Sequence, residues 1–184
     1  MNGLVLLLLI ALPAFVSAQE GPREMTPGEL ENYEFEIEES QVTVSDLSLG
    51  QRYVLSTQRR EIEDLIARRL GILSLKGDRS DLKVMQDLVE RKVLRETREW
   101  QSLGIVFGDI LAAEFDLHWI SYEDELGISK ALKWQKTENY VFPVTLFSKR
   151  IQFNEKINVL AVFEKIEADV SSFKAFEKGR PVFK

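Results

Sequence analysis

The chain has 184 residues, of which 45% are apolar and 29% charged, with a formal net charge of −6 at pH 7. This composition is typical of a folded globular protein and excludes wholesale disorder. The absence of cysteine excludes disulfides and thiolate metal sites, and a single histidine, His118, excludes a multi-histidine metal centre within one chain. The acidic balance argues against a nucleic-acid partner, and we expect neither a cofactor nor a bound metal.

The N-terminal segment 1–18 predicts a secretory signal peptide. Residues 4–16 are almost purely apolar, no charged residue occurs before Glu20, and the segment ends in Val16-Ser17-Ala18. A membrane-spanning helix needs roughly 20 apolar residues, whereas the small residues at the end fit cleavage after Ala18. We therefore expect an exported protein, periplasmic or secreted, with no membrane span in its mature chain. An uncleaved amphipathic or core helix is the alternative.

An acidic arm or linker is expected over 19–45. Residues 19–46 contain nine acidic residues and a single basic one, Arg23, so this segment carries most of the negative charge. Prolines and a glycine disfavour helix or strand in its first half. Between 33 and 44, apolar and acidic residues alternate as in a half-buried strand, and both a strand and a linker remain open there.

Helices and then short strands are expected in the body of the chain, a single domain over 46–173. Apolar spacing predicts helices over about 51–70, 81–91 and 96–115, with Gly71 as a left-handed C-cap of the first and Ser80 as the N-cap of the second. In the third helix, Gly104 and Gly108 lie four residues apart. This spacing lets another backbone approach closely, which predicts tight packing inside a core.

Three strands are expected next, over 117–122, 131–135 and 140–142, and their short connections favour an antiparallel meander. Trp119 and Trp134 then lie on neighbouring strands, where they can pair. Pro143 suits the first position of a helix that reaches 151, although a strand continued to 147 is the alternative. A last helix over 157–173 precedes a basic tail at 174–184. The fold class is therefore α+β, with helices around a three-stranded sheet.

Several spaced motifs resemble those of a known bacterial family. They are the upstream stretches at 58–62 and 77–82, followed by Leu103-Gly104-x-x-Phe107-Gly108, Trp119-x-x-x-x-Asp124-Glu125-x-Gly127 and Phe142-Pro143-x-x-x-x-Ser148-Lys149-Arg150. Together they resemble the domain-of-unknown-function family 3806, over roughly 46–167. The resemblance implies a small α+β domain of bacterial origin and implies no activity.

Five residues stand out as candidates for a binding site: Trp119, Asp124, Glu125, Lys149 and Arg150. The two acids lie in the densest acidic cluster of the body, and an arginine beside a lysine suits a carboxylate or phosphate. A solvated turn and an ordinary surface pair are the plainer interpretations. We also expect an acid of the bend to pair with Arg150, and we assign no catalytic residue, because His118 lacks a placed nucleophile.

Two classes of function follow from these features. The first is a non-catalytic module at the cell envelope that binds a protein or a small ligand, including an inhibitor-like protein that docks through its acidic arm. The second is an exported hydrolase that uses Asp124 and Glu125, with Arg150 orienting an anionic substrate. A pocket that unites these three residues would favour the hydrolase.

Overall fold

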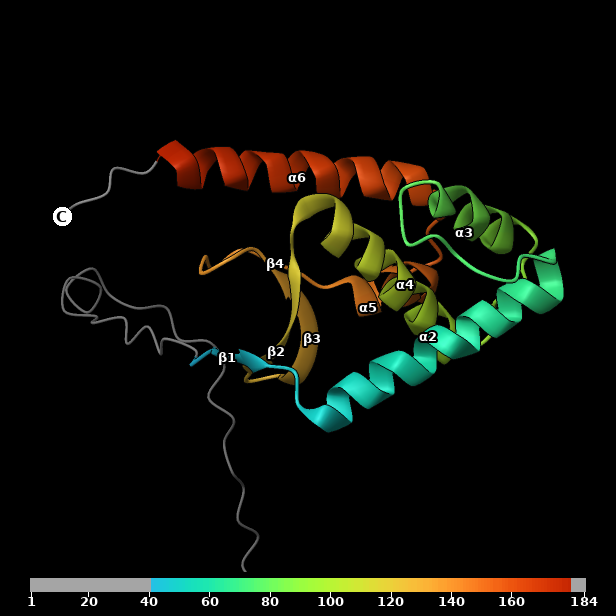
Figure 1. Cartoon of the computed structure of the whole chain (residues 1–184), viewed down its shortest axis with the longest axis horizontal. Helices are drawn as coiled ribbons and strands as arrows, with labels where there is room; N and C mark the ends of the chain where they lie inside the picture. The colour runs from blue at the N-terminus through green and yellow to red at the C-terminus, as the bar shows by residue number, and fades with distance from the viewer. Residues whose placement is uncertain (1–40, 180–184) are drawn as a thin grey trace, which may run out of the picture. The chain divides into compact units, whose positions relative to one another are not determined.

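A computed structural model describes residues 41–179. The expected signal peptide, most of the expected arm and the end of the expected tail lie outside the described residues. In chain order the described elements are β1 (Thr43–Asp46), α2 (Leu49–Leu70), α3 (Asp81–Glu90), α4 (Thr97–Phe115), β2 (His118–Asp124), β3 (Gly127–Lys133), β4 (Tyr140–Val141), α5 (Pro143–Gln152) and α6 (Val159–Gly179) (Figure 1). The α+β class is confirmed.

The sheet has four antiparallel strands in the order β1-β2-β3-β4, so the expectation of three strands was wrong. The missing strand is β1, in which Thr43 pairs with Glu123 and Asp46 pairs with Ile120. Only one of its four residues, Val44, is even half-buried. The first two residues of β1 lie in the segment 33–44, for which the sequence allowed both a strand and a linker, and they form a strand. With so little apolar alternation, this strand depends on its hydrogen bonds to β2.

The β2–β3 hairpin is tighter than the expected bend over 123–127. The ladder runs on to the pair Asp124 and Gly127, which leaves only two residues in the turn. The backbone N–H of Leu126 donates to Asp124 Oδ1 at 2.9 Å, and Gly127 adopts φ of 117°, which disfavours other residues. The second strand therefore begins earlier than expected. Trp119 lies opposite Leu132, so the expected pairing of Trp119 with Trp134 was wrong.

The helices agree closely with their expected ranges. Gly71 forms the left-handed C-cap of α2, and Pro143 opens α5, so the continued-strand alternative was wrong. Ser80 does not cap α3 through its hydroxyl, which instead donates to Asp78 Oδ1. At the other end, α6 continues to Gly179, beyond the expected end at 173.

The main core lies between one face of the sheet and the helices α4, α5 and α6, and α2 and α3 also contribute buried residues to it (Figure 1). At its centre, the ring of Phe107 meets those of Phe147 and Phe163 edge to face, with centroids 5.1 and 6.2 Å apart. A smaller cluster of Leu47, Leu55 and Ile105 lies where α2 crosses α4. No helix within 41–179 is long and apolar enough to cross a membrane.

The two glycines of α4 bring it against its neighbours, as expected. A Cβ atom at Gly104 would lie 2.3 Å from the carbonyl oxygen of Pro143, and one at Gly108 would lie 2.5 Å from the ring of Trp119. Both distances are far shorter than van der Waals contact. The glycines therefore fix how closely α5 and the indole of Trp119 approach α4.

Candidate functional site

The structure does not bring the acidic bend and the basic pair together. Asp124 accepts a hydrogen bond within its own turn, and Glu125 is exposed at the tip of the hairpin. Arg150 instead donates from Nη1 to Glu155 Oε2 at 2.8 Å. Within residues 41–179, neither acid forms an ion pair or hydrogen bond with Arg150, so the expected pairing was wrong. Glu155, five residues further along the chain, accepts from the guanidinium of Arg150 in place of the hairpin acids.

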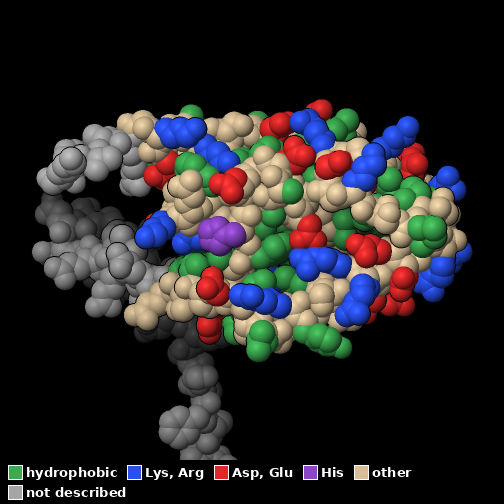
Figure 2. All heavy atoms as spheres, viewed as in Figure 1, with side chains coloured by type: hydrophobic (Ala, Val, Ile, Leu, Met, Phe, Trp, Pro, Cys, Tyr) green, Lys and Arg blue, Asp and Glu red, His purple; other side chains and the backbone are tan. Residues whose placement is uncertain are grey.

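The remaining members of the expected site are also separated. Lys149 is exposed on α5, and the Nε of Arg150 is buried without a partner in the described part of the chain. His118 is exposed on β2. On the face in view in Figure 2, it lies among interspersed acidic and basic side chains. Only Trp119, of the five residues proposed from sequence, takes part in a cluster that joins several elements.

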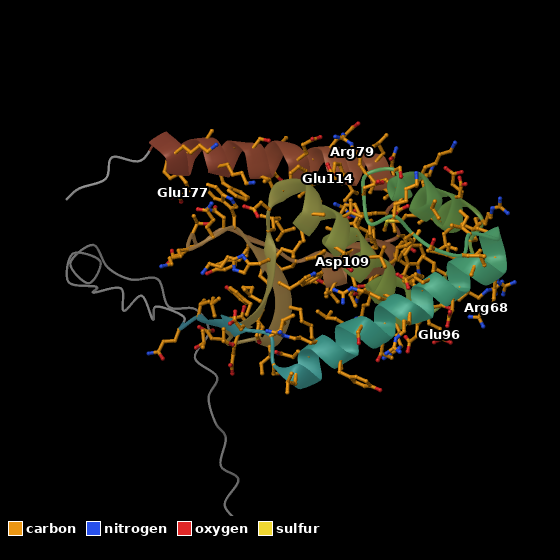
Figure 3. The ribbon with its side chains drawn as sticks, viewed as in Figure 1. Arg68, Arg79, Glu96, Asp109, Glu114 and Glu177 are labelled. Atoms are coloured by element: carbon orange, nitrogen blue, oxygen red, sulfur yellow. The ribbon has the colours of Figure 1, made fainter. Side chains whose placement is uncertain are left out.

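Trp119 belongs to a hydrogen-bonded cluster with one residue from each of two helices. Its indole Nε1 donates to Asp109 Oδ1 at 2.8 Å, and Asp109 lies on α4 (Figure 3). The same carboxylate accepts two hydrogen bonds from Arg59 of α2, through Nε and through Nη2 at 2.7 Å. The side chains of Arg59 and Asp109 are 29% and 30% exposed, so the pair is half-buried. Three donors therefore hold one carboxylate.

The start of α2 is fixed over the sheet by its capping residues. Ser48 and Gln51 form a capping box, in which each side chain accepts from the other's backbone N–H. The amide of Gln51 also donates to Ser121 of β2 at 2.8 Å. Because Arg52 and Arg59 are seven residues apart, close to two helical turns, they lie on one face of α2. The capping contacts turn that face toward Trp119.

A pocket of about 420 Å³ lies on this face, and we call it the α2 pocket. Its volume is within the range of roughly 300–1,000 Å³ that is typical of small-molecule sites. It lies over the smaller apolar cluster, which supplies two of its walls. The lining residues are Leu47, Arg52, Leu55, Ser56, Arg59 and Trp119. Asp109 lies behind the lining and holds Arg59 in place.

A second hollow, of about 260 Å³, lies between α2 and the start of α4. Most of its charged groups are already paired, although Arg68 donates from Nε only to the backbone carbonyl of Asp64. Arg98 donates to both carboxylate oxygens of Glu61 at 2.9 Å, and Glu99 accepts from the backbone at the start of α4. The hydrogen bond from Arg98 lowers the pKa of Glu61. With its acids and Arg98 engaged, this hollow offers a ligand less than the α2 pocket does.

The chemistry that the α2 pocket can support is binding rather than acid–base catalysis. The carboxylate behind its lining, Asp109, accepts from Arg59 and Trp119 and does not itself line the pocket. The hydroxyl of Ser56 donates to the carbonyl of Tyr53 at 2.8 Å, and no general base contacts it. No group of three histidine, aspartate or glutamate side chains in the described range is arranged to hold a metal ion.

Sequence reasoning missed Arg52, Arg59 and Asp109 as members of this site. Two signals were present. Two arginines seven residues apart share one helix face, and Asp109 is a charged residue inside a helix stretch in which nearly all neighbours are buried. An acid in such a stretch needs a partner, and an arginine on another helix is the simplest one.

A comparison with known protein families identifies part of the chain. Residues 81–163 match the model of the domain of unknown function DUF3806. This segment is similar to that family. The resemblance noted from sequence is thereby confirmed, over a shorter range than 46–167. The match includes Asp109 and Trp119 but not α2, so the arginines of the α2 pocket lie outside the matched DUF3806 segment.

A solved structure shares the fold. It is a crystal structure from Bacteroides thetaiotaomicron VPI-5482, which superposes with a TM-score of 0.63 at 16% sequence identity. The match covers 70% of this chain and 48% of the other, so the chain spans about half the length of that protein. At this identity the likeness concerns the fold alone. No curated protein matches the sequence.

Proposed function

We propose that the protein is a non-catalytic binding module and that the α2 pocket is its binding site. The observation that carries this proposal is the arrangement of hydrogen bonds around Asp109. One carboxylate fixes an arginine and a tryptophan from two other elements, and both of these side chains then line an open pocket. Such a fixed arrangement favours recognition, because the groups that touch a ligand are already in position.

The hydrolase alternative has less support from the geometry. It requires Asp124, Glu125 and Arg150 to share a pocket, and the first two lie at a hairpin tip while the third is paired with Glu155. No pocket found between the described elements unites them.

A variant that fills the α2 pocket tests the proposal. A library of small acids, bases and neutral compounds is titrated into the full-length chain, and the indole N–H signals of Trp100, Trp119 and Trp134 are followed by NMR. We expect at least one compound to shift the Trp119 signal saturably. Ser56→Phe should abolish that binding, whereas Asp64→Phe, which adds the same ring at an exposed position of α2, should retain it.

Three results would contradict the proposal. The first is that no compound binds saturably, and the second is that Ser56→Phe leaves binding unchanged. The third is turnover of a bound compound by the protein, which would make it an enzyme. Unfolding curves of both variants show whether loss of binding reflects loss of structure.

We also propose that the module is exported and works at the cell envelope, outside the cytoplasm. This rests on the apolar segment 4–16 and the Val16-Ser17-Ala18 sequence that follows it. N-terminal sequencing of the protein isolated from its host should then begin at Gln19. An intact Met1 on the soluble protein would rule out cleavage.

A further inference from the structure

The α2 pocket carries positive charge that is not neutralised. Arg52 donates from Nε to the carbonyl oxygen of Leu47 at 3.0 Å, and no acceptor within residues 41–179 binds its Nη1 or Nη2. Arg59 directs Nε and Nη2 to Asp109, while its Nη1 has no acceptor in the same range. The guanidinium of Arg52 therefore has no paired acid in the described range. The charge of Arg59 is balanced by Asp109, but its Nη1 remains available as a donor.

The other walls are mainly apolar. Leu47 and Leu55 are buried, and the ring of Trp119 is half-buried between them and α4. Among the described residues no aspartate or glutamate lines the pocket, so a cationic ligand would meet two arginines with no acid in the lining. A neutral apolar ligand would leave the donors of Arg52 unused. The lining thus suits a molecule that is anionic at one end and apolar along its body.

We propose that the α2 pocket binds a small carboxylate with an apolar body, its carboxylate on Arg52 and its body against Trp119. The inference rests on the proposed function, because it names the ligand class of the same site. A guanidinium presents parallel N–H donors that match the two oxygens of a carboxylate. Arg59 Nη1 is placed to supply a further donor.

Carboxylate is favoured over phosphate by charge and by the available donors. With Arg59 balanced by Asp109, the site has about one net positive charge, which matches a monoanion. A phosphate site usually adds backbone N–H groups at a helix start. Here the side chain of Ser48 already occupies the N–H of Gln51, in the first turn of α2. The apolar walls would also be left empty by a bare phosphate.

Binding is measured with defined probes on the full-length chain, by the shift of the Trp119 indole N–H signal. Octanoate and 3-phenylpropionate carry both the charge and the body, 1-octanol carries the body alone, and acetate and inorganic phosphate carry charge without the body. We expect the two long carboxylates to bind saturably. Loss of the charge should weaken binding about tenfold or more, as is typical when a charge-assisted hydrogen bond is lost. Loss of the apolar body should weaken binding by a similar factor, because the burial of apolar surface is lost.

Variants of α2 separate the role of Arg52 from general charge. Arg52→Gln should weaken octanoate binding about tenfold or more, and Arg52→Lys should recover only part of the loss, because lysine lacks the planar fork. Arg60→Gln is the matched control, since Arg60 is exposed on the same helix and does not line the pocket. Arg52 is itself exposed, so its replacement is compatible with folding, which unfolding curves check.

Each outcome bears on the proposal. Equal binding of octanoate by the native chain and Arg52→Gln would overturn it, as would phosphate or 1-octanol binding as tightly as octanoate. If no carboxylate binds but the library yields another ligand that Ser56→Phe blocks, the ligand class is wrong and the proposed function stands. If the library also yields nothing, both proposals fail.

Discussion

The helix α4 contacts two of its helical neighbours, α5 and α2, in opposite ways. Toward α5 it offers no side chain at Gly104, so that the two backbones come into direct contact. Toward α2 it offers Arg98 and Asp109, each of which forms a two-pronged ion pair with a residue of α2. The contact with α5 depends on a residue without a side chain, and the contact with α2 depends on long charged side chains.

This difference explains where a ligand can be accommodated. Backbone packed on backbone leaves no volume and cannot relax without moving a whole helix. The contact with α2 ends in long, partly exposed side chains, beside which hollows of about 420, 390 and 260 Å³ remain. The side of α4 that faces α5 therefore sets the architecture, while the side that faces α2 is open to recognition.

The largest effect is expected from adding a methyl group at the close contact. Gly104→Ala should gain about 1 kcal/mol in helix propensity, yet its Cβ would overlap the backbone oxygens of Pro143 and Val144. We expect a net loss of about 3 kcal/mol or more in the free energy of unfolding. Urea unfolding measures it.

Two further glycines calibrate this prediction. Gly108→Ala would meet the side chains of Trp119 and Pro143, which can shift, so its cost should be smaller, about 1–2 kcal/mol. Gly50→Ala meets only the hydroxyl of Ser48, at 4.0 Å, and should be neutral or slightly stabilising. Stability of Gly104→Ala equal to that of Gly50→Ala would show that α4 and α5 are not in backbone contact.

An intermediate effect is expected at the half-buried ion pair. Asp109→Ala leaves Arg59 and the indole of Trp119 without their acceptor, and we expect a loss of about 1–3 kcal/mol, between the values for exposed and buried pairs. Asp109→Asn keeps an acceptor for Trp119 and should cost less. Thermal or urea unfolding measures both. Equal losses for the two variants would mean that the negative charge accounts for the whole contribution of Asp109 and that a neutral acceptor for Trp119 adds nothing.

The helical part of the fold could be predicted from sequence because its signals are local. Apolar residues recur at helical spacing, and Gly71 and Pro143 mark a helix end and a helix start without reference to the rest of the chain. The glycine spacing in α4 likewise predicted close packing, although it could not name α5 as the partner. By contrast, β1 depends on its pairing with β2, which is distant in sequence.

The candidate site was harder to predict for the same reason. Arg59 and Asp109 are fifty residues apart, and nothing in the local sequence of either one names the other. The partner expected for Arg150 was also wrong, because its guanidinium donates to Glu155, five residues away, and not to an acid of the hairpin. Trp119 was among the candidate site residues named from sequence, but its hydrogen bond to Asp109 follows only from the packing of β2 against Gly108.

The smallest effect is expected at the exposed pair of Arg98 and Glu61. The hydrogen bond from Arg98 lowers the pKa of Glu61 below its ordinary value of 4.5, although desolvation opposes the shift. A carboxyl group with a lowered pKa in the folded state stabilises the fold above the unfolded-state pKa. That stabilisation is lost as the pH falls through the folded-state pKa. The pair should therefore add slightly to the loss of stability below about pH 4.5.

Glu61→Gln removes the titrating group, so the fall in stability between neutral and acid pH should become slightly shallower. Asp64→Asn is the matched control, because Asp64 is an exposed acid on the same helix whose carboxylate contacts no described residue. The contribution of Glu61 should also shrink in high salt, since the pair is open to solvent. Urea unfolding at a series of pH values measures the difference. An effect of Glu61→Gln as large as that of Asp109→Ala would mean that the two ion pairs of α4 are equivalent, and the contrast between a half-buried and an exposed contact would not hold.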